Sequence, residues 1–550
     1  MKNFLILLSI IFFGTGLSAQ EKPNILWISV EDISPNLSFY GDNTAETPNL
    51  DSLAKKSLIY DNAFTTVGVC APSRSSLITG MQPISLGTIH MRTARDAQGW
   101  GKRKYREDIG RKDIEGNKIS EYSAVVPLGV KCFSEYLRAE GYYCTNNKKT
   151  DYQFAAPISA WDENSSKAHW RNREKRQPFF SVFNIEDTHE SKLWKYEDKP
   201  LTVKPENVPV PPYFPDTPAT RESIARHYSN IEIMDKKVGE IIHQLKKDGL
   251  YDNTIIVFFS DHGGPLPRQK RAIYDSGLRV PLLIKYPGNR NAGRTDRLIS
   301  FVDMAPTMLS LAGIKPPDYI QGKAFAGSFD TDPREYIIAS SDRFDEITDR
   351  IRAVRTKDYL YLHNFYPEKS GYKNISYRMN IPMMEPMLKM RNNGSLDSIQ
   401  MQWFQKKQAE ELYEVHKDPY DIYNIVNKKS QEEELKKMRE ILRNFLLENP
   451  DLGQMPEAKL ISLMWPGNKQ PETKKPVFER KGNKIEISTG TPGSSIVYMI
   501  TDDKNIDIGL DGNWKLYTEP ISILKGKSIF SRAERIGFTT SRVAVFENQK

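Results

Sequence analysis

The sequence has few cysteines and no long hydrophobic run beyond its N-terminus. Its 550 residues contain three cysteines, Cys70, Cys132 and Cys144, so a fold held together by many disulfides is excluded. Cys132 and Cys144 could pair, but their spacing alone does not establish a disulfide. No later stretch is apolar over the length that a membrane-spanning helix needs. The sequence therefore predicts no transmembrane segment.

Nucleic-acid-binding motifs are also missing. We find no zinc finger, basic zipper or aromatic–basic RNA-binding motif. The 78 basic residues outnumber the 70 acidic residues, for a formal net charge of +8, and most of this charge is a mixed, solvated surface. The balance favours anionic ligands, but the sequence predicts no nucleic-acid partner.

The N-terminus has the pattern of a secretory signal peptide. Lys2 precedes the apolar run FLILLSIIFF, and small residues follow as far as Ser18-Ala19. A charged start, a short apolar segment and a small residue at the cleavage site are typical of export signals. We therefore expect a signal peptide over residues 1–19 and an exported protein, periplasmic or secreted.

The stretch VGVCAPSRSSLITG, from Val67 to Gly80, predicts a reactive site. Pro72 suits the first turn of a helix and Gly80 suits its end. Cys70 is then expected at a helix N-terminus, where free N–H groups and the helix dipole favour an anion. Arg74 lies about one turn further on, beneath Cys70. This pattern predicts a nucleophile for an oxyanion ester, and the alternative is a buried structural cysteine.

Two compact apolar runs end in acidic residues. Asn24–Val30 is predicted to be a buried parallel strand and precedes Glu31-Asp32, while Thr254–Ser260 is a second such strand and precedes Asp261-His262. Sites in open α/β sheets gather at the carboxyl ends of the strands. Carboxylate oxygens at such an edge suit a hard divalent cation such as Ca²⁺.

The remaining patterns complete an α/β prediction. Phe179–Ile185 is a third apolar strand candidate, and an amphipathic helix is expected from about Thr220 to Asp248. From about Pro471, short alternating runs are separated by turn residues, as in a small β-sandwich.

The segment Cys70-Ala71-Pro72-Ser73-Arg74, extended by Leu77-Ile78-Thr79-Gly80, resembles the maturation motif of type I sulfatases, in the alkaline-phosphatase superfamily. Gln269–Pro281 and Glu411–Asn424 also resemble elements of this family. The sequence around Glu31-Asp32 and Asn146–Asp151 is most similar to the branch of N-sulfoglucosamine sulfohydrolases and bacterial polysaccharide sulfatases. The resemblance implies that a sulfatase-maturing enzyme oxidises Cys70 to formylglycine (3-oxoalanine).

The resemblance also implies the fold and its division. We expect an α/β fold with a large mixed, mostly parallel sheet flanked by helices, a smaller α+β subdomain and a terminal β-sandwich module. The expected boundaries are a signal peptide over 1–19, a catalytic domain over 20–365, a C-terminal sulfatase subdomain over 366–465 and the accessory module over 466–550.

A metal site follows from the same resemblance. One divalent cation, Ca²⁺, is expected at Glu31, Asp32, Asp261 and His262, with the modified Cys70 as a further ligand. The family usually has an aspartate at the position of Glu31, so this ligand departs from the pattern.

Basic residues are implied to bind the sulfate group. Arg74, Lys149 and Lys270 take the positions of sulfate-binding cations in the family, and Lys148 replaces Lys149 if the register shifts by one residue. Asp151 stands where the family has a histidine. Asp151 could orient the aldehyde hydrate, act as a base or mark a different arrangement.

Two histidines complete the candidate site. The resemblance implies that His189 is the leaving-group acid or a sulfate ligand. His90 is a candidate for substrate binding, and the alternative is an ordinary loop histidine.

The implied activity is hydrolysis of sulfate esters, or of N-sulfate, on a sulfated oligo- or polysaccharide. Heparan-type glycans and algal polysaccharides such as ulvan both stay open as substrates. One alternative is a phosphatase or phosphodiesterase of the same superfamily. Such an enzyme would need a Ser or Thr nucleophile and a richer, two-metal set of ligands. The chain has only eight histidines, which makes such a ligand set less expected. The other alternative is a non-catalytic glycan-binding protein.

Overall fold

The computed structural model describes residues 22–547, apart from 95–103, 503–508, 511–512 and 523–525. The signal peptide predicted over residues 1–19 lies outside the described residues. None of the described helices has the length and apolar composition needed to cross a membrane.

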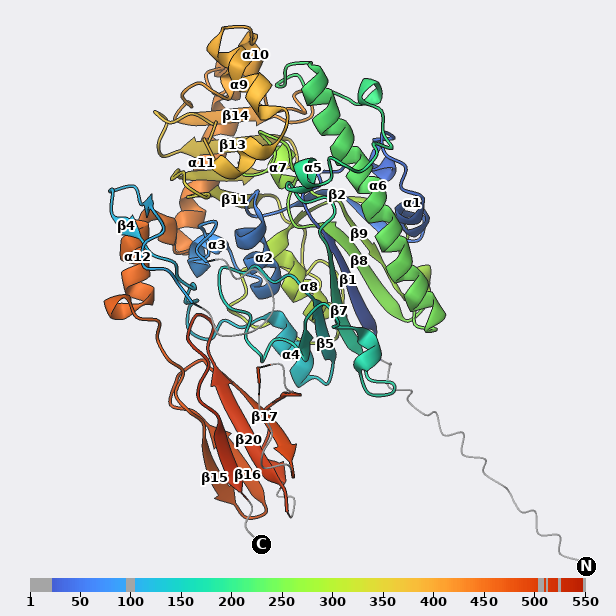
Figure 1. Ribbon diagram of the computed structural model, residues 1–550, viewed down its shortest axis with the longest axis vertical. Coiled ribbons are helices and arrows are strands. Elements are labelled where there is room, and N and C mark those ends of the chain that lie inside the picture. Colours follow the sequence, from blue (N-terminus) through green and yellow to red (C-terminus); the bar gives the residue numbers. More distant parts are fainter. Residues whose placement is uncertain (1–21, 95–103, 503–508, 511–512, 523–525, 548–550) are drawn as a thin grey trace, which may run out of the picture.

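An eight-stranded sheet with the order β10-β2-β9-β8-β1-β7-β5-β6 forms the centre of the molecule (Figure 1). The central strand β1 (Asn24–Val30) pairs in parallel with β7 (Phe179–Ile185) and β8 (Thr254–Ser260). The three predicted apolar runs are therefore adjacent strands. The other strands are β2 (Leu58–Phe64), β5 (Tyr143–Asn147), β6 (Glu163–Asn164), β9 (Leu282–Lys285) and β10 (Gly293–Ser300). Because β9 runs antiparallel to both of its neighbours, the sheet is mixed but mostly parallel, as predicted.

Alternate side chains of β1 enter two different cores. Ile25 and Trp27 pack with the helices on one face, whereas Leu26 and Ile28 pack with the helices on the other. Successive strand residues point to opposite faces, so a strand that is apolar at every position needs helices on both sides. The first face carries α2 (Cys70–Thr79), α4 (Phe133–Ala139) and α8 (Met304–Leu311), and the second carries α1 (Pro48–Ala54) and α6 (Pro218–Lys247).

The long helix α6 fits its sequence pattern. Thr217 caps its N-terminus by accepting a hydrogen bond from the Thr220 N–H over 3.2 Å, and Pro218 occupies the first turn. Ile231, Met234 and other apolar residues of one stripe are buried against the sheet. In Figure 1, α6 runs along the whole side of the sheet.

The carboxyl ends of the central strands are level. Val30, the last residue of β1, pairs with Ile185 of β7 and with Ser260 of β8. The residues that follow these three strands therefore meet at one edge of the sheet. Helix α2 begins at Cys70 near the same edge, and this arrangement creates the candidate site.

Shorter elements surround this framework. They are β3 (Arg111–Lys112), β4 (Lys118–Ile119), α3 (Pro83–Leu86), α5 (Lys192–Lys195), α7 (Asp275–Leu278), α9 (Met384–Asn392), α10 (Ser398–Gln402) and α12 (Glu457–Met464).

A second, antiparallel sheet has the order β11-β12-β13-β14 and packs against α11 (Glu432–Glu448). Its strands are β11 (Ile337–Ser341), β12 (Ile351–Arg355), β13 (Tyr359–Asn364) and β14 (Glu410–Glu414). Because β13 pairs with β14, this sheet extends across the domain boundary that the sequence predicts at residue 365. The pairing joins strands from both sides of that boundary into one subdomain.

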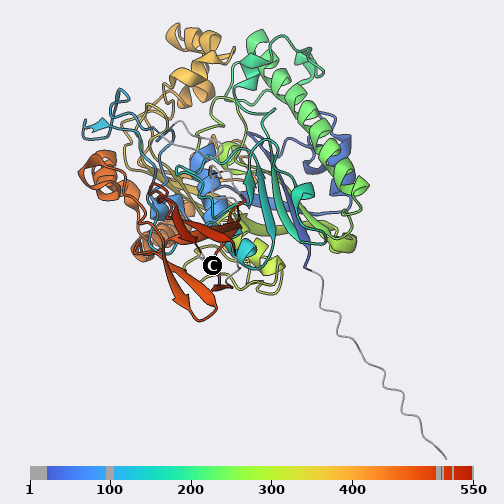
Figure 2. The same cartoon turned by 60° about the horizontal axis from the view of Figure 1, so that its bottom comes forward.

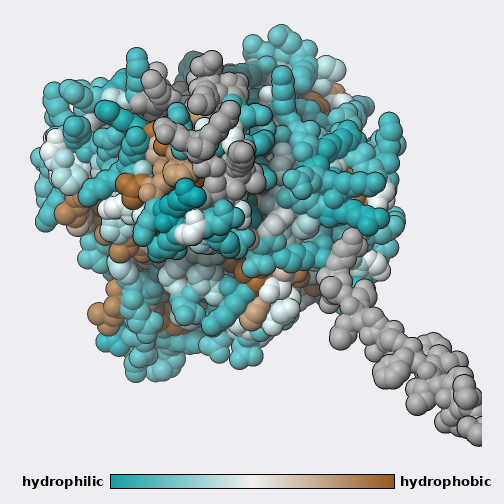
Figure 3. Space-filling model, turned by 90° about the horizontal axis from the view of Figure 1, so that it is seen from below, coloured by the Kyte–Doolittle hydropathy of each residue, from teal (hydrophilic) through white to brown (hydrophobic). Residues whose placement is uncertain are grey.

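The C-terminal segment forms a β-sandwich, which lies below α4 in Figure 1 and comes forward in Figure 2. One sheet contains β15 (Val477–Lys481), β16 (Lys484–Ser488) and β19 (Ile521–Ser522). The other contains β17 (Ser495–Thr501), β18 (Lys515–Leu516), β20 (Ser528–Glu534) and β21 (Ala544–Glu547). Seen from this end, the described surface is mostly hydrophilic, with small scattered apolar patches (Figure 3).

The sandwich is fastened to the α/β domain by polar contacts. Arg138 of α4 donates to the Trp514 carbonyl over 2.7 Å, and Lys131 donates to Ser495 Oγ over 2.6 Å. Cys132 and Cys144, which the sequence left open as a pair, are both buried and free.

Glu534 makes the contact between the β-sandwich and the α/β domain sensitive to pH. It is buried at the end of β20, where its carboxyl accepts hydrogen bonds from the Ile158 N–H and the Thr540 hydroxyl. Burial raises the pKa of Glu534 from 4.5 to about 7. The folded protein then holds a proton that the unfolded chain releases, so stability falls as the pH rises from about 4.5 through about 7.

We expect Glu534→Gln to abolish this loss, because glutamine keeps an acceptor for Ile158 and does not ionise. The free energy of unfolding of the variant, relative to that of the wild type, should rise by roughly 3 kcal/mol between pH 4.5 and pH 8, because each unit of pKa shift corresponds to about 1.4 kcal/mol. Urea unfolding at several pH values measures it. The matched control is Glu479→Gln on the exposed strand β15, and a gain at Glu534 that stays constant with pH would contradict the assignment.

Candidate active site

Helix α2 places Cys70 at the edge of the sheet where the central strands end. The preceding residue Val69 is extended (φ −156°), and Gly80 ends the helix in a left-handed conformation (φ 71°). Cys70 is only 1% exposed. Its Sγ lies 3.3 Å from His262 Nε2 and 3.4 Å from Lys270 Nζ. The thiol thus occupies the positive end of a buried helix, between two basic groups.

Arg74, one turn after Cys70, is held by residues at or near the carboxyl ends of three different strands. Its Nε donates to Asp261 Oδ2 over 3.0 Å, and its Nη1 donates to Asn184 Oδ1 over 2.8 Å. Its Nη2 lies 3.4 Å from Glu31 Oε1. Although burial opposes the charge, the neighbouring carboxylates keep the pKa of Arg74 above its ordinary value. The guanidinium is therefore a fixed positive charge beneath the thiol.

Three carboxylates converge beside Cys70. Glu31, Asp32 and Asp261 are each at most 1% exposed. Two groups of potential ligand atoms each lie within 4.8 Å of one another: Glu31, Asp32, Cys70 and His189, and Asp32, Cys70, Asp261 and His262. Buried carboxylates this close together need positive charge around them.

Two lysines supply part of that charge. Lys149 Nζ lies 2.6 Å from Glu31 Oε1, and Lys270 Nζ lies 2.5 Å from Asp32 Oδ2. Burial disfavours the charged amines, but the nearby acidic groups raise the pKa of both lysines above the ordinary value. Asp151 Oδ2 lies 3.8 Å from Lys149 Nζ, so the structure brings Asp151 to the rim of this cluster.

The carboxyl groups respond differently to the same surroundings. Burial raises the pKa of Glu31, with the charge of Lys149 acting against it. Burial also acts on Asp32, but Lys270 and His262 outweigh it and hold the pKa of Asp32 well below its usual value. The backbone of Asp32 is left-handed (φ 51°), a conformation uncommon outside glycine and often found at functional sites.

The donor set fits a bound cation. Asp32 Oδ1 is buried and has no well-aligned hydrogen bond among the described residues, although His262 Nε2 lies 3.0 Å away. His262 Nδ1 lies 2.9 Å from the Gly263 carbonyl, which can only accept, so Nδ1 carries a proton and Nε2 faces the carboxylates. Burial opposes a charged imidazole, but Asp261 and Asp32 raise the pKa of His262 to about 10. A cation would replace the Nε2 proton, because a metal-binding histidine must be neutral there.

His189 also faces Glu31. Its Nε2 is 3.8 Å from Glu31 Oε2, and its Nδ1 accepts a hydrogen bond from the Ser191 N–H over 3.1 Å. Burial and the charge of Lys270 lower the pKa of His189 well below 6.5. The imidazole is therefore neutral, with its proton on Nε2, the atom that faces the cluster.

His90 is not brought into this cluster. Its Nδ1 accepts from the Arg343 N–H over 3.3 Å, and its Nε2 lies 3.9 Å from Glu457. Burial lowers the pKa of His90 to about 4. The contacts of His90 in the structure are those of a buried structural histidine. Among the described residues, Lys149 forms ion pairs with Glu31 and Asp151, whereas Lys148, the alternative to Lys149, forms no ion pair with the acidic cluster.

Several residues that contact the site were not expected from the sequence. Asn184, near the end of β7, accepts from Arg74 and donates to Asn146 Oδ1 over 3.0 Å and to the Asn147 carbonyl over 3.1 Å. An amide residue near the end of the mostly apolar run FFSVFNI was the one available signal. Arg271, next to Lys270, forms ion pairs of 2.8 Å with both Glu190 and Asp345, and no local pattern indicates these partners.

A sequence profile of the sulfatase family matches residues 23–204 and 140–314 of the chain. A second profile, described as the C-terminal part of N-sulphoglucosamine sulphohydrolase, matches residues 268–376. An ulvan-active sulfatase of Formosa agariphila is 41% identical to this chain, over 96% of this chain and 92% of its own length. The chain belongs to the sulfatase family. The family, branch and enzyme class predicted from the sequence are confirmed, and the protein is a sulfuric ester hydrolase.

Solved structures show how widely the fold of this sulfatase is shared. A 2-O GAG sulfatase superposes with a TM-score of 0.55 at 17% identity, covering 78% of this chain and 92% of that one. A phosphonate monoester hydrolase from Silicibacter pomeroyi superposes with a TM-score of 0.54 at 15% identity, covering 78% and 96%. The fold alone therefore does not separate sulfate esters from phosphonate esters, and family membership decides the class.

Asn184 offers a test of how the sulfatase positions Arg74. We expect Asn184→Ala to lower kcat/KM for an arylsulfate about 10- to 100-fold, because a hydrogen bond to a charged group contributes about 1.5–3 kcal/mol. Steady-state kinetics measures the loss. The control is Asn172→Ala, whose side chain binds Glu163 on the surface. An unchanged kcat/KM in Asn184→Ala would show that Asp261 and Glu31 suffice to hold Arg74.

Proposed function

We propose that this sulfatase is exported and removes sulfate esters from ulvan-type algal polysaccharide, with a formylglycine at position 70 and one Ca²⁺ ion. One observation carries the proposal: Cys70 opens a buried helix with His262 and Lys270 within 3.4 Å of its Sγ, beside the carboxylate cluster. Of the two substrate classes that the sequence left open, the name and 41% identity of the Formosa relative support ulvan.

Three cations are proposed to bind the sulfate group. Arg74, Lys149 and Lys270 approach the cluster from α2, the segment after β5 and the loop after β8. They are fixed before substrate arrives, so they stabilise developing negative charge without reorganisation. A Ca²⁺ ion held by Glu31, Asp32, Asp261 and His262, with the modified Cys70, would add Lewis-acid stabilisation of the sulfate oxygens.

The nucleophile requires modification of Cys70. We propose that a sulfatase-maturing enzyme produces the formylglycine, and one hydroxyl of its hydrate supplies the attacking oxygen. Lys270 Nζ and His262 Nε2 lie nearest to the Cys70 side chain. The charged amine of Lys270 would donate a hydrogen bond that orients this hydroxyl, whereas His262, as a proposed cation ligand, would not accept its proton.

His189 is proposed to assist the leaving group. The neutral imidazole carries its proton on Nε2, so it can donate a hydrogen bond to the ester oxygen as negative charge develops there. The Ser191 N–H that binds Nδ1 fixes this tautomer. Asp151 is proposed to orient Lys149, since its carboxylate lies 3.8 Å from that amine.

Export and maturation rest on the sequence alone. The N-terminal charge, apolar run and Ser18-Ala19 pattern support a signal peptide over residues 1–19 and a periplasmic or secreted protein. The Cys70–Arg74 motif supports recognition by a sulfatase-maturing enzyme.

Mass spectrometry of the peptide from Ser57 to Arg74 tests the nucleophile. We expect formylglycine at position 70 in protein produced with a sulfatase-maturing enzyme, and an unmodified thiol without it. Cys70→Ser should lower arylsulfate turnover by about 1000-fold or more, because a serine sulfate ester has no second hydroxyl to expel sulfate. Full arylsulfatase activity with an unmodified Cys70 would overturn the mechanism.

Substrate comparison tests the reaction and its specificity. We expect hydrolysis of an arylsulfate and not of the matching arylphosphate, and sulfate release from ulvan oligosaccharides faster than from heparan oligosaccharides. Preference for the phosphate would favour the phosphatase alternative. Preference for heparan oligosaccharides would agree with the sulfatase class but contradict the proposal that ulvan is the substrate.

Metal removal tests the cation. Chelation should lower activity by about tenfold or more, and it should also lower the melting temperature, because three buried carboxylates lose a neutralising charge. Ca²⁺ should restore both better than Mg²⁺, which accepts this irregular donor set less readily. Activity and melting temperature that do not respond to chelation would contradict a bound cation.

A further inference from the structure

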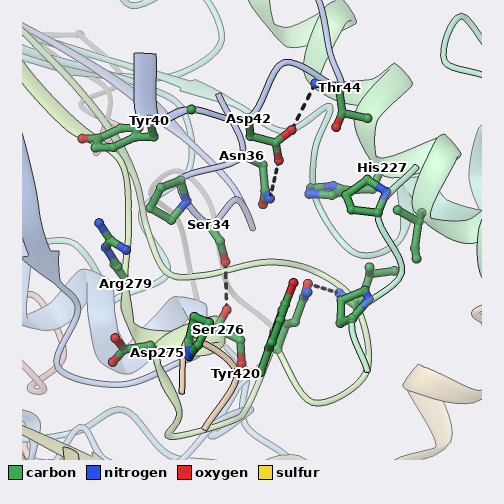
Figure 4. Close-up of a pocket in the computed structure, with 18 of the residues that line it drawn as sticks. Ser34, Asn36, Tyr40, Asp42, Thr44, His227, Asp275, Ser276, Arg279 and Tyr420 are labelled. Atoms are coloured by element: carbon green, nitrogen blue, oxygen red, sulfur yellow. Dashed lines mark hydrogen bonds between the residues drawn. The ribbon is translucent and has the colours of Figure 1, made fainter. Parts of the chain in front are cut away.

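A cavity of about 1290 Å³ lies outside the catalytic cluster, on the flank of the main sheet. Its walls come from the loop after β1, the N-terminal half of α6, the α7 segment and the chain around residue 420. In Figure 4, Asn36, Asp42 and His227 lie at the top of this flank pocket, while Asp275, Ser276 and Tyr420 lie at the bottom. No role in the proposed mechanism involves these residues.

The flank pocket shares a wall with the catalytic site. Ser34, two residues after Asp32, donates to the Ser276 carbonyl over 2.9 Å and accepts from the Gly264 N–H over 2.9 Å (Figure 4). Gln269, immediately before Lys270, also lines the pocket. The two sites are therefore on opposite sides of the loops that carry Asp32 and Lys270.

The charges of the pocket disfavour a sulfate group. Five lining residues are acidic, namely Asp42, Asp61, Glu206, Asp275 and Asp296. The three lining arginines are already engaged. Arg355 makes two hydrogen bonds to Asp275, Arg221 makes two to Asp216, and Arg279 donates to the Asp61 carbonyl. The five carboxylates outnumber the three arginines of the described lining, so the pocket disfavours a sulfated ligand.

A metal ion is not indicated there either. Among the described residues, both groups of side chains with metal-ligand spacing lie at the catalytic site. Asp42 is occupied by protein donors, since Tyr228 Oη donates to it over 2.6 Å and the Thr44 N–H over 3.0 Å.

His227 supplies a polar group without a protein partner. It is 3% exposed and lines the pocket, and neither ring nitrogen has a hydrogen-bond partner among the described residues. Burial lowers the pKa of His227 to about 4, so the ring is neutral and offers one donor and one acceptor. A buried polar group of this kind is normally satisfied, and a ligand hydroxyl provides both roles.

The opposite side of the pocket offers an aromatic surface. Tyr420 is 40% exposed, and its ring contacts Tyr213 edge-on at a centroid distance of 6.0 Å. Proline residues 209, 211 and 419 add apolar surface nearby. An exposed aromatic face, flanked by carboxylate and amide acceptors, suits a ligand that is apolar on its ring face and polar at its edge.

We propose that the flank pocket is a second carbohydrate-binding site, which takes a hydroxyl-rich, unsulfated saccharide segment. His227 and Asn36 bind its hydroxyl groups, and Tyr420 stacks on a sugar ring. The inference rests on the proposed function, because a polysaccharide substrate supplies such segments. The site retains the polymer through sugars that carry no sulfate.

Binding without turnover tests this site separately from catalysis. Isothermal titration of the full-length protein with chemically desulfated ulvan oligosaccharides should show saturable binding. Tyr420→Ala should weaken it about 3- to 10-fold, whereas Tyr420→Trp should retain it. The matched control is Tyr423→Ala, whose side chain is 61% exposed outside the pocket, and it should bind as the wild type does.

Two results would overturn the proposal. One is the absence of binding by the wild-type protein, and the other is equal affinity in wild type, Tyr420→Ala and Tyr423→Ala. Arylsulfate hydrolysis is measured on the same samples. Because the oligosaccharide carries no sulfate, a protein that binds it but hydrolyses no arylsulfate would contradict the proposed function and leave the second site standing.

Discussion

The structure depends on the mutual neutralisation of buried charges around Cys70. Glu31, Asp32 and Asp261 would repel one another in a site sealed from water, and each buried charge without a partner costs several kcal/mol. Arg74, Lys149 and Lys270 offset this repulsion through contacts of 2.5 to 3.4 Å. The same cations that make the acidic cluster tolerable are those whose geometry suits a sulfate group. Stability and function therefore place the same demand on these residues.

The main sheet makes this neutralisation possible. The acidic residues follow strands whose last pairs are level, Val30 with Ile185 and Val30 with Ser260. A shift of one residue would turn the side chains of a strand to the opposite face. Helices on both faces bury every residue of β1 and so fix this register. The site is precise because it stands at the end of a rigid, doubly covered sheet.

The C-terminal sheet contributes to the same edge. Asp345 follows β11 and contacts Arg271, the neighbour of Lys270. Arg271 also binds Glu190, and the Glu190 N–H donates to Asp32 over 2.7 Å. A chain of contacts thus links the antiparallel subdomain to the carboxylate cluster. The strands β11 to β13, which the sequence division placed in the catalytic domain, belong to this antiparallel sheet because β13 pairs with β14.

The sequence by itself determined the elements that carry the chemistry. Three apolar runs gave β1, β7 and β8 with correct bounds, and Pro72 and Gly80 framed the helix of Cys70, because these signals are local. The motif also placed Arg74 beneath Cys70, since one helical turn is a short-range distance. The tertiary structure alone decided which distant residues meet: Asn184 with Arg74, Asp345 with Arg271, and His90 with Arg343 and Glu457 instead of the site. Such contacts depend on strand register and on how subdomains pack, and no local pattern of residues encodes either.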